Sequence, residues 1–243
     1  IVMELGGKSP QIVLADADLD LAVNGIAAGI FPAGGQSCIS GSRLLVHEKI
    51  IDEFTYRLVD VVKKARIGDP NDPRTQIGPM ANKPHYESVL ARIDAAERCG
   101  HQLLLDGRTA CRDTGYFIGP TIFADVPNNA DLAQNETFGP VVSTERWSDE
   151  QSVIQTANDT IYGLAGGIWS GDVARAMRMA DRIEARTIYI NNYFNAATQS
   201  PVGGFKQSGY GRENGFEGMR CFMQTKSVWL ATHPTQADPF PED

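Results

Sequence analysis

Residues 11–47 read QIVLADADLDLAVNGIAAGIFPAGGQSCISGSRLLVH, and this stretch decides the fold. Its first four residues, 11–14, hold the apolar run 12–14 and predict a strand. Between 18 and 31 the apolar residues recur at helical spacing, until Pro32 ends the pattern. The run 43–47 then predicts a second strand. A strand, a helix and a strand in succession indicate the βαβ unit of a parallel sheet.

The same alternation continues along the chain. Further strands are predicted at 102–105, 121–125, 141–147, 165–169 and 187–190, and helices at 50–64, 82–99 and 172–183, with one more beginning at a capping box of Ser148 and Gln151. Loops are predicted at 68–79, 107–120 and 191–215, where glycine and proline gather. A last strand, 228–231, is expected to pair outside the main sheet, with another subunit. The predicted fold is therefore α/β, a mostly parallel twisted sheet flanked by helices, plus a C-terminal oligomerisation strand.

The composition narrows the class of protein. The chain has 243 residues, of which 42% are hydrophobic, so it can bury a sizeable core. A net charge of −8 without any block of basic residues argues against nucleic acid and anionic membrane surfaces as partners. The sequence holds no apolar run of roughly 20 residues, the length of a membrane helix.

The cysteines and histidines do not form a metal or disulfide pattern. Four cysteines, Cys38, Cys99, Cys111 and Cys221, lie far apart without a CxxC pair, and four histidines are dispersed. The sequence therefore predicts free thiols in a reducing compartment, the cytoplasm, and no site for a zinc ion.

Cys38 is the leading candidate for a catalytic residue. It lies in 34–43, a run of small and polar residues between two apolar segments. Such neighbours keep backbone N–H donors close and side-chain bulk low, which suits a thiolate that attacks a substrate. The alternative is an inert structural cysteine, which apolar neighbours usually surround.

Glu4 is the second candidate. It precedes a double-glycine turn in ELGGKSP, residues 4–10, and glycines let the backbone approach a ligand closely. A carboxylate there is able to act as a general base. The alternative is a strand-end acid paired with Lys8.

Two further motifs carry polar groups. In NETFGP, residues 135–140, Glu136 and Phe138 point to the same side if the segment is extended, so that a carboxylate for sugar hydroxyls would lie beside a flat apolar ring. The alternative is a polar loop with one buried phenylalanine. The glycines of PVGGFKQSGYGRENG, residues 201–215, do not fit GxGxxG, which favours a shaped loop over a phosphate cradle.

Taken together, the motifs ELGGKSP, GQSC, NETFGP and PVGGFKQSGYGRENG resemble those of the aldehyde dehydrogenase superfamily. Their order and spacing both match, and the similarity covers nearly the whole chain. The last motif is most similar to betaine-aldehyde-type and related bacterial members. The resemblance implies oxidation of a small aldehyde to a carboxylic acid, with NAD or NADP as cofactor, through a cysteine thiohemiacetal and a thioester.

The resemblance also implies a role for each residue of the site. Cys38 matches the nucleophile and Glu4 the general base. Glu136 matches the acid that binds the nicotinamide ribose, Phe138 the ring beside the nicotinamide, and Leu5 a backbone contact to its amide.

Other positions depart from the family pattern or match it weakly. Asn135 stands where many relatives carry a second acid. Ala196 and Val202 stand where many relatives have aromatic residues lining the aldehyde tunnel, which argues against an aromatic box for long apolar aldehydes. Lys206 and Gly209 match a backbone potassium site of some betaine-aldehyde-type members.

The resemblance also predicts the domain organisation. Residues 1–243 correspond to a catalytic domain, about 5–225, with an oligomerisation segment, about 226–243. The dinucleotide-binding domain lies mainly before Glu4 in the family and is expected to be largely absent, so the polypeptide alone is expected to bind NAD weakly and to be inactive as a dehydrogenase. A homo-oligomer is expected. Two alternatives stay open, namely a non-enzymatic assembly domain and a thiol-dependent esterase.

Overall fold

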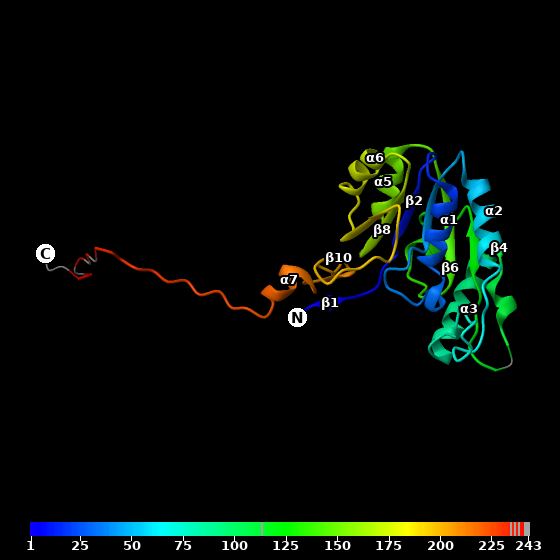
Figure 1. The fold of residues 1–243 in the computed structure, drawn as a ribbon, viewed down its shortest axis with the longest axis horizontal. Helices are drawn as coiled ribbons and strands as arrows, with labels where there is room; N and C mark the ends of the chain where they lie inside the picture. Colours follow the sequence, from blue (N-terminus) through cyan, green and yellow to red (C-terminus); the bar gives the residue numbers. More distant parts are fainter. Residues whose placement is uncertain (113, 234, 236, 238, 241–243) are drawn as a thin grey trace.

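A seven-stranded sheet forms the centre of the computed structural model, which describes residues 1–112, 114–233, 235, 237, 239 and 240 (Figure 1). Its strands are β2 (Pro10–Val13), β3 (Arg43–His47), β4 (Gln102–Leu105), β5 (Thr121–Ala124), β6 (Val141–Trp147), β8 (Ala165–Trp169) and β9 (Thr187–Ile190). The order across the sheet is β4-β5-β6-β3-β2-β8-β9, and every neighbouring pair is parallel except β4 with β5. The predicted α/β fold with a mostly parallel sheet is confirmed.

Helices cover both faces of this sheet. They are α1 (Leu19–Ala28), α2 (Ile51–Val62), α3 (Lys83–Arg98), α5 (Glu150–Asn158) and α6 (Val173–Ala180). Figure 1 shows α1 and α2 on one side of the strands and α5 and α6 on the other. The helix α3 packs with the short helix α4 (Asp131–Gln134) at the β5–β6 end, in a separate apolar cluster.

The two faces are built from alternate residues of the same strands. Leu44 and Val46 of β3 pack with α1 and α2, whereas Leu45 between them packs with α5 and α6. Successive strand residues point to opposite faces, so a strand covered on both sides is apolar at every position. The continuous apolar runs of the sequence follow from this arrangement.

Two helix ends differ from the predictions. The first helix ends at Ala28, not at Phe31, because the chain turns into the short 3₁₀ segment η1 (Pro32–Gly35), which leads to the cysteine. The helix α5 is capped by Asp149, whose side chain accepts from the Ser152 N–H at 2.7 Å, and not by Ser148. A carboxylate one residue later fits the same role, since aspartate is a strong N-cap.

The loop predicted at 191–215 contains short elements that the sequence pattern did not show. The strand β1 (Met3–Glu4) pairs with β11 (Gly209–Tyr210), and β7 (Tyr162–Gly163) pairs with β10 (Phe205–Lys206), both antiparallel. The helix α7 begins at the end of the loop and spans Gly215–Arg220. Two-residue strands are too short for any periodicity to reveal.

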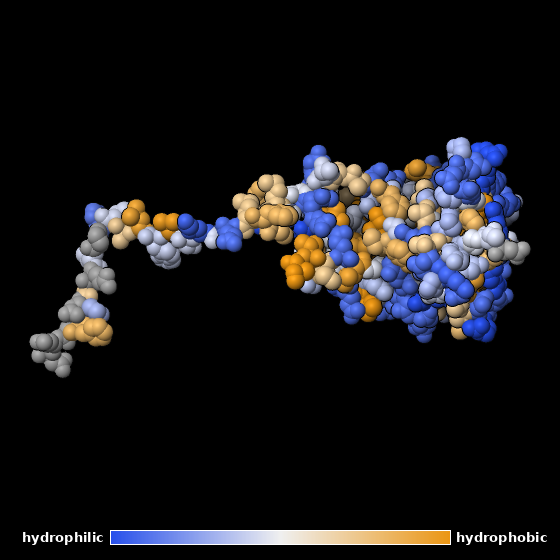
Figure 2. All heavy atoms as spheres, turned by 90° about the horizontal axis from the view of Figure 1, so that it is seen from below, coloured by the Kyte–Doolittle hydropathy of each residue, from blue (hydrophilic) through white to orange (hydrophobic). Residues whose placement is uncertain are grey.

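The predicted strand 228–231 is not formed within the single chain, and its expected pairing with another subunit stays a prediction. These residues form no strand, and the side chain of Trp229 is 95% exposed. A strand needs a partner for its N–H and C=O groups, and the segment extends away from the sheet (Figure 1). Figure 2 shows hydrophobic residues where this tail leaves the body and along it. Residues 234, 236, 238 and 241–243 of the predicted tail lie outside the described residues.

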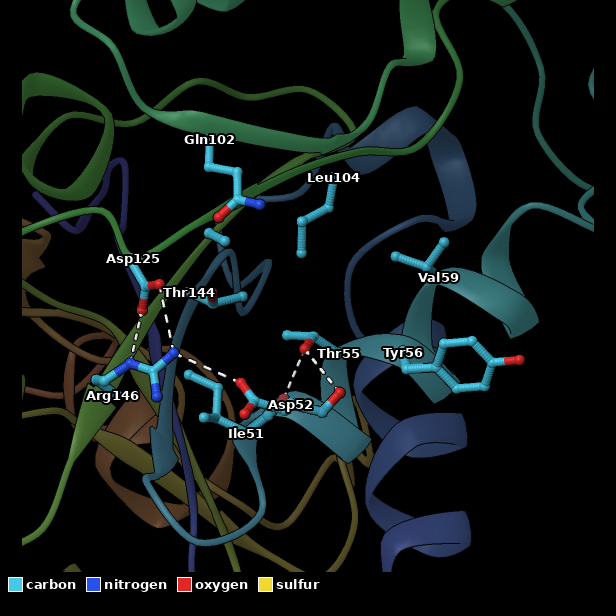
Figure 3. A pocket seen from close by; sticks show the side chains of 11 residues that line it. Ile51, Asp52, Thr55, Tyr56, Val59, Gln102, Leu104, Asp125, Thr144 and Arg146 are labelled. Carbon is cyan, nitrogen blue, oxygen red and sulfur yellow. Dashed lines mark hydrogen bonds and ion pairs between the residues drawn. The ribbon is translucent and has the colours of Figure 1, made fainter.

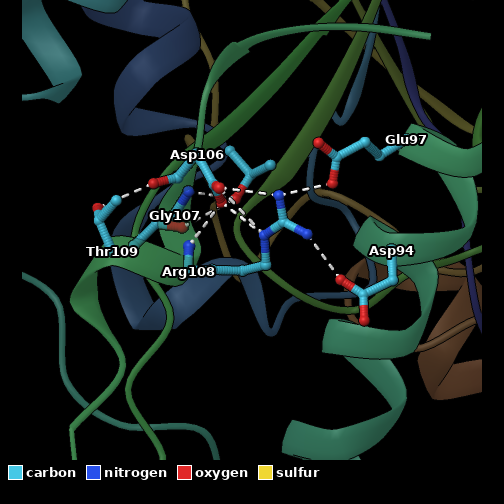
Figure 4. A network of polar contacts seen from close by, with 8 residues as sticks. Asp94, Glu97, Asp106, Gly107, Arg108 and Thr109 are labelled. Atoms are coloured by element: carbon cyan, nitrogen blue, oxygen red, sulfur yellow. Dashed lines mark hydrogen bonds and ion pairs between the residues drawn. The ribbon is translucent and has the colours of Figure 1, made fainter. Parts of the chain in front are cut away.

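A charged cluster ties α3 to the strand after it (Figure 4). The guanidinium of Arg108 forms ion pairs with Asp94, Glu97 and Asp106 at 2.7–2.8 Å. Because Asp106 follows β4 directly, the cluster fixes how α3 lies against the antiparallel edge of the sheet.

Among the described helices, none combines the length and apolarity needed to cross a membrane.

Candidate active site

The candidate site lies at the edge of the sheet where the parallel strands begin. Residues 4–9 lead into β2, 36–42 into β3, 135–140 into β6, and 163–164 into β8. Since β6, β3, β2 and β8 are consecutive parallel neighbours, the segments that enter them meet at one edge. The fold therefore brings together three motifs that lie far apart in the sequence.

The double-glycine turn is in direct contact with both other motifs. The Gly7 N–H donates to Oε1 of Glu136 at 3.1 Å. A Cβ on Gly7 would lie 2.5 Å from the carbonyl oxygen of Cys38, and a Cβ on Gly6 would lie 2.3 Å from Oε2 of Glu136. The absence of side chains at the two glycines is what lets the cysteine turn and the Glu136 carboxylate lie against this backbone.

Ser208 joins the fourth motif to the same turn. Its buried hydroxyl donates to the Gly6 carbonyl at 2.7 Å and accepts from the Gly163 N–H at 3.0 Å. Its own carbonyl accepts from the Leu5 N–H at 3.0 Å. One serine therefore fixes the backbone on both sides of the turn that carries Glu4.

We expect Ser208→Ala to destabilise the fold by about 1–3 kcal/mol, because it leaves the Gly6 carbonyl and the Gly163 N–H without their partner. Urea denaturation measures the change. Ser152→Ala is the matched control, since the hydroxyl of Ser152 bonds only within the first turn of an exposed helix. Equal free energies of unfolding for the two variants would contradict the role given to Ser208.

The Cys38 thiol is half-buried in a turn, and its surroundings favour the protonated form. Burial raises the pKa of the thiol, and the backbone N–H groups of Ile39 and Cys38 oppose this change. The negative charges of Glu4 and Glu136 raise the pKa further. Both acids therefore lie close enough to the sulfur to influence it, and a positive charge placed beside them would release the thiolate.

Glu4 is exposed at the end of β1, and it does not pair with Lys8. Partial burial raises the pKa of the Glu4 carboxyl, and the charge of Glu213 adds to the increase. Glu213 belongs to the GRENG part of the fourth motif, whose pattern does not single out this residue. A raised pKa makes the Glu4 carboxylate a better proton acceptor.

The NETFGP segment is not uniformly extended. Phe138 has a positive φ of 53°, so the expectation that Glu136 and Phe138 share a face through a simple strand alternation is wrong. The backbone turns at Phe138, whose carbonyl lies 2.7 Å from Nε2 of His85 and whose ring packs edge-on against that imidazole. Phe138 remains 38% exposed, so the alternative of a buried phenylalanine is also wrong.

Lys8 is a buried cation next to this site. Its side chain is 1% exposed, and its Nζ has no hydrogen-bond partner among the described residues. Burial lowers the pKa of Lys8 to about 7, and the positive charges of Arg43 and Arg92 add to the decrease, while Glu136 and Asp131 oppose it. Neither the alternation pattern nor the motif search indicated a buried lysine here.

A protein-family model described as the aldehyde dehydrogenase family matches residues 1–228. The chain belongs to the aldehyde dehydrogenase family. It is 44% identical over 233 residues to a betaine aldehyde dehydrogenase of Brucella anthropi, covering 95% of this chain and 48% of that protein. An aldehyde dehydrogenase of Enchytraeus buchholzi is 40% identical over 236 residues, covering 97% of this chain and 47% of that protein.

Solved structures of the aldehyde dehydrogenase family show the same fold. A betaine aldehyde dehydrogenase of Staphylococcus aureus, in complex with NAD⁺, has a TM-score of 0.94 at 37% identity, covering 100% of this chain and 48% of that one. An NAD-dependent aldehyde dehydrogenase of Sinorhizobium meliloti has a TM-score of 0.94 at 41% identity, covering 97% and 47%. The chain thus spans about half the length of the relatives it matches.

The remaining positions taken from the family pattern lie around the fourth motif. Ala196 is exposed, and Val202 is half-buried and exchanges two backbone hydrogen bonds with Glu213, at 2.8 and 2.9 Å. The Nζ of Lys206 donates to the carbonyl of Asn158 at 2.6 Å, and Gly209 lies in β11. The structure does not test the potassium site, which stays a prediction.

A pocket of the chain lies away from these motifs. It encloses about 380 Å³ between α2 and the strands β4, β5 and β6, with Arg146 held between Asp125 and Asp52 at its rim (Figure 3). None of the residues assigned to the site lines it. The candidate active site is therefore identified by the contacts between the motifs and not by a deep pocket. In the part of the chain that is described, no cluster of three metal-ligating side chains occurs.

Proposed function

We propose that residues from about 5 to 225 form the catalytic domain of an NAD(P)-dependent aldehyde dehydrogenase. Glu4, directly before this domain, is proposed as the general base of the reaction. The observation that carries this proposal is the contact of the double-glycine turn after Glu4 with both the Cys38 backbone and the Glu136 carboxylate. A thiol with a carboxylate nearby supplies a nucleophile and a general base, two groups that acyl transfer through a cysteine uses.

Each step of the proposed reaction uses a group of this chain. The Cys38 sulfur attacks the aldehyde carbon, and the Cys38 N–H stabilises the oxyanion of the thiohemiacetal. Bound NAD(P)⁺ supplies the hydride acceptor and a positive charge beside the thiol. Glu4 then takes a proton from the water that hydrolyses the resulting thioester, which releases the carboxylic acid.

The residues present fit the nicotinamide half of the cofactor. The Glu136 carboxylate is half-buried, and its Oε1 accepts the Gly7 N–H while acceptor capacity remains for ribose hydroxyls. The ring of Phe138, two residues further along the chain, is 38% exposed, and the Leu5 backbone lies in the turn that leads to Gly7. The S. aureus and S. meliloti relatives are described with NAD, which favours NAD over NADP here.

We infer that the adenosine half of the cofactor is bound by the half of the relatives that this chain does not match. The relatives are about twice as long, and the adenosine-binding domain is proposed to lie in their remaining half. We expect calorimetry on the 243-residue chain to show NAD binding weaker than the micromolar range. Micromolar binding by the chain alone would overturn this assignment of domains.

Two assays separate the dehydrogenase from the alternatives. The chain, and a longer protein that supplies the relatives' other half, are tested with a small aldehyde plus NAD and with an activated ester. The proposal expects aldehyde oxidation by the longer protein and acyl transfer from the ester to Cys38 in both. Ester hydrolysis without any aldehyde oxidation by the longer protein favours a thiol esterase, and inactivity in both assays favours an assembly domain.

We infer that the segment 226–243 serves oligomerisation. Val228, Trp229 and Leu230 are each more than 80% exposed, and exposed apolar residues in an extended segment are suited to strand pairing with a second copy. Light scattering on the chain and on a version ending at residue 225 tests this. If particles of the two versions contain the same number of chain copies, the role given to this segment is contradicted.

A further inference from the structure

Tyr193 connects the far end of the sheet to the turn that carries Cys38. It lies three residues after the end of β9, and its hydroxyl donates to the carbonyl of Ile39 at 2.7 Å. Ile39 follows the cysteine directly. The sequence positions are 154 residues apart, so this hydrogen bond is a tertiary contact. No motif of the sequence pointed to Tyr193.

The aromatic ring of Tyr193 is closely packed, so the position of its hydroxyl is well defined. A Cβ on Gly29, at the end of α1, would lie 2.7 Å from Cδ1 of the ring. The rings of Tyr189 and Phe194 lie 4.7 and 5.5 Å from it, measured between centroids. Burial raises the pKa of Tyr193, which keeps the phenol protonated and therefore a donor at neutral pH.

The carbonyl that Tyr193 holds belongs to the turn that surrounds the thiol. The N–H groups of Cys38 and Ile39 both act on the sulfur and favour the thiolate. The turn is closed by the Ser40 N–H, which donates to the Ser37 carbonyl at 3.0 Å. The Cys38 carbonyl packs on Gly7. The Tyr193 bond therefore fixes the next carbonyl along the turn, that of Ile39.

We propose that Tyr193 is a positioning residue, whose hydroxyl holds the 37–40 turn in the conformation that presents the Cys38 and Ile39 N–H groups to the nucleophilic sulfur. The inference rests on the proposed role of Cys38 as the nucleophile. It predicts that the reactivity of the thiol depends on a phenol whose hydroxyl bonds the backbone of the turn.

The test is the rate at which iodoacetamide alkylates Cys38, measured across a range of pH by mass spectrometry of the Cys38 peptide. Tyr193→Phe keeps the ring and removes only the donor. We expect it to lower the alkylation rate about three- to tenfold near pH 8, the effect of one hydrogen bond of ordinary strength, and to move the pH midpoint upward. Tyr189→Phe is the matched control, since the ring of Tyr189 packs in the same cluster and its hydroxyl makes no hydrogen bond among the described residues.

An unchanged alkylation rate in Tyr193→Phe would overturn the proposal, and so would an equal decrease in Tyr189→Phe. If Tyr193→Phe does not melt cooperatively, hydrogen exchange of amides 39–41 in the unsubstituted chain decides instead. Protection close to that of the sheet is expected, and exchange as fast as in the exposed tail would contradict a held turn. The alkylation assay needs neither aldehyde nor NAD. A longer protein without dehydrogenase activity would therefore contradict the proposed function but would leave the result for Tyr193 unaffected.

Discussion

Glu4→Gln is expected to slow hydrolysis of the acyl-enzyme by about 10²–10⁴-fold, the usual contribution of a general base. An activated ester such as p-nitrophenyl acetate acylates Cys38 directly, so the experiment does not require cofactor. Glutamine keeps the size of the side chain but cannot accept a proton from water. Mass spectra of the intact protein should then show the acetylated form accumulating, whereas the unsubstituted chain returns to the free thiol.

The environment of Glu4 gives the physical reason for this expectation. Partial burial and the charge of Glu213 raise the pKa of the carboxyl, which increases its affinity for the proton it has to accept. The same carboxylate raises the pKa of Cys38, so its removal should make the thiol easier to ionise. Glu4→Gln is therefore expected to speed alkylation of Cys38 while it slows deacylation.

Opposite effects on the two steps separate the two roles that the sequence left open for Glu4. If Glu4 activated the thiol, Glu4→Gln would slow acylation and alkylation, and no acyl-enzyme would accumulate. Glu213→Gln is the matched control, because it only lowers the pKa of Glu4 toward its ordinary value and should slow deacylation far less. A free thiol throughout turnover in Glu4→Gln would refute its assignment as the base.

The sequence predicted the sheet well because its strands are covered on both faces. The run 43–47 is a strand with the predicted bounds, since burial on both sides leaves an apolar signal at each of residues 44–46. The strand 141–147 also has the predicted bounds, although only its first two residues and its last are apolar. The pattern failed where structure depends on a partner. The two-residue strands β1 and β11 exist only through each other, and 228–231 has nothing to pair with inside the chain.

The sequence predicted only those residues of the candidate site whose chemical role follows from a motif. The motifs pointed to Cys38, Glu4 and Glu136, and parallel pairing explains why they meet at one edge of the sheet. The residues that adjust these groups act through tertiary contacts. Glu213 lies in the fourth motif and Tyr193 just before it, but neither pattern singles out these two side chains, so only the fold reveals their contacts.

Lys8→Met is expected to stabilise the fold by about 5 kcal/mol near pH 6, the largest change in stability that the structure predicts. Burial lowers the pKa of Lys8 to about 7 from an ordinary value of 10.5. Between these two values the unfolded chain holds a proton that the folded chain lacks, so the stability of the unsubstituted protein rises with pH across this window. Below about pH 7 the folded protein must bury the charged ammonium, and methionine removes that cost.

The gain in Lys8→Met should therefore shrink as pH rises and vanish near pH 10.5, which urea denaturation at a series of pH values measures. Lys63→Met is the matched control, because the ammonium of Lys63 is exposed and paired with Asp60. A gain independent of pH would contradict the buried-charge explanation. The buried ammonium of Lys8 therefore lowers the stability of the fold at the edge of the sheet where the proposed chemistry takes place. The charges of Glu136, Arg43, Arg92 and Asp131 also act on Lys8 there.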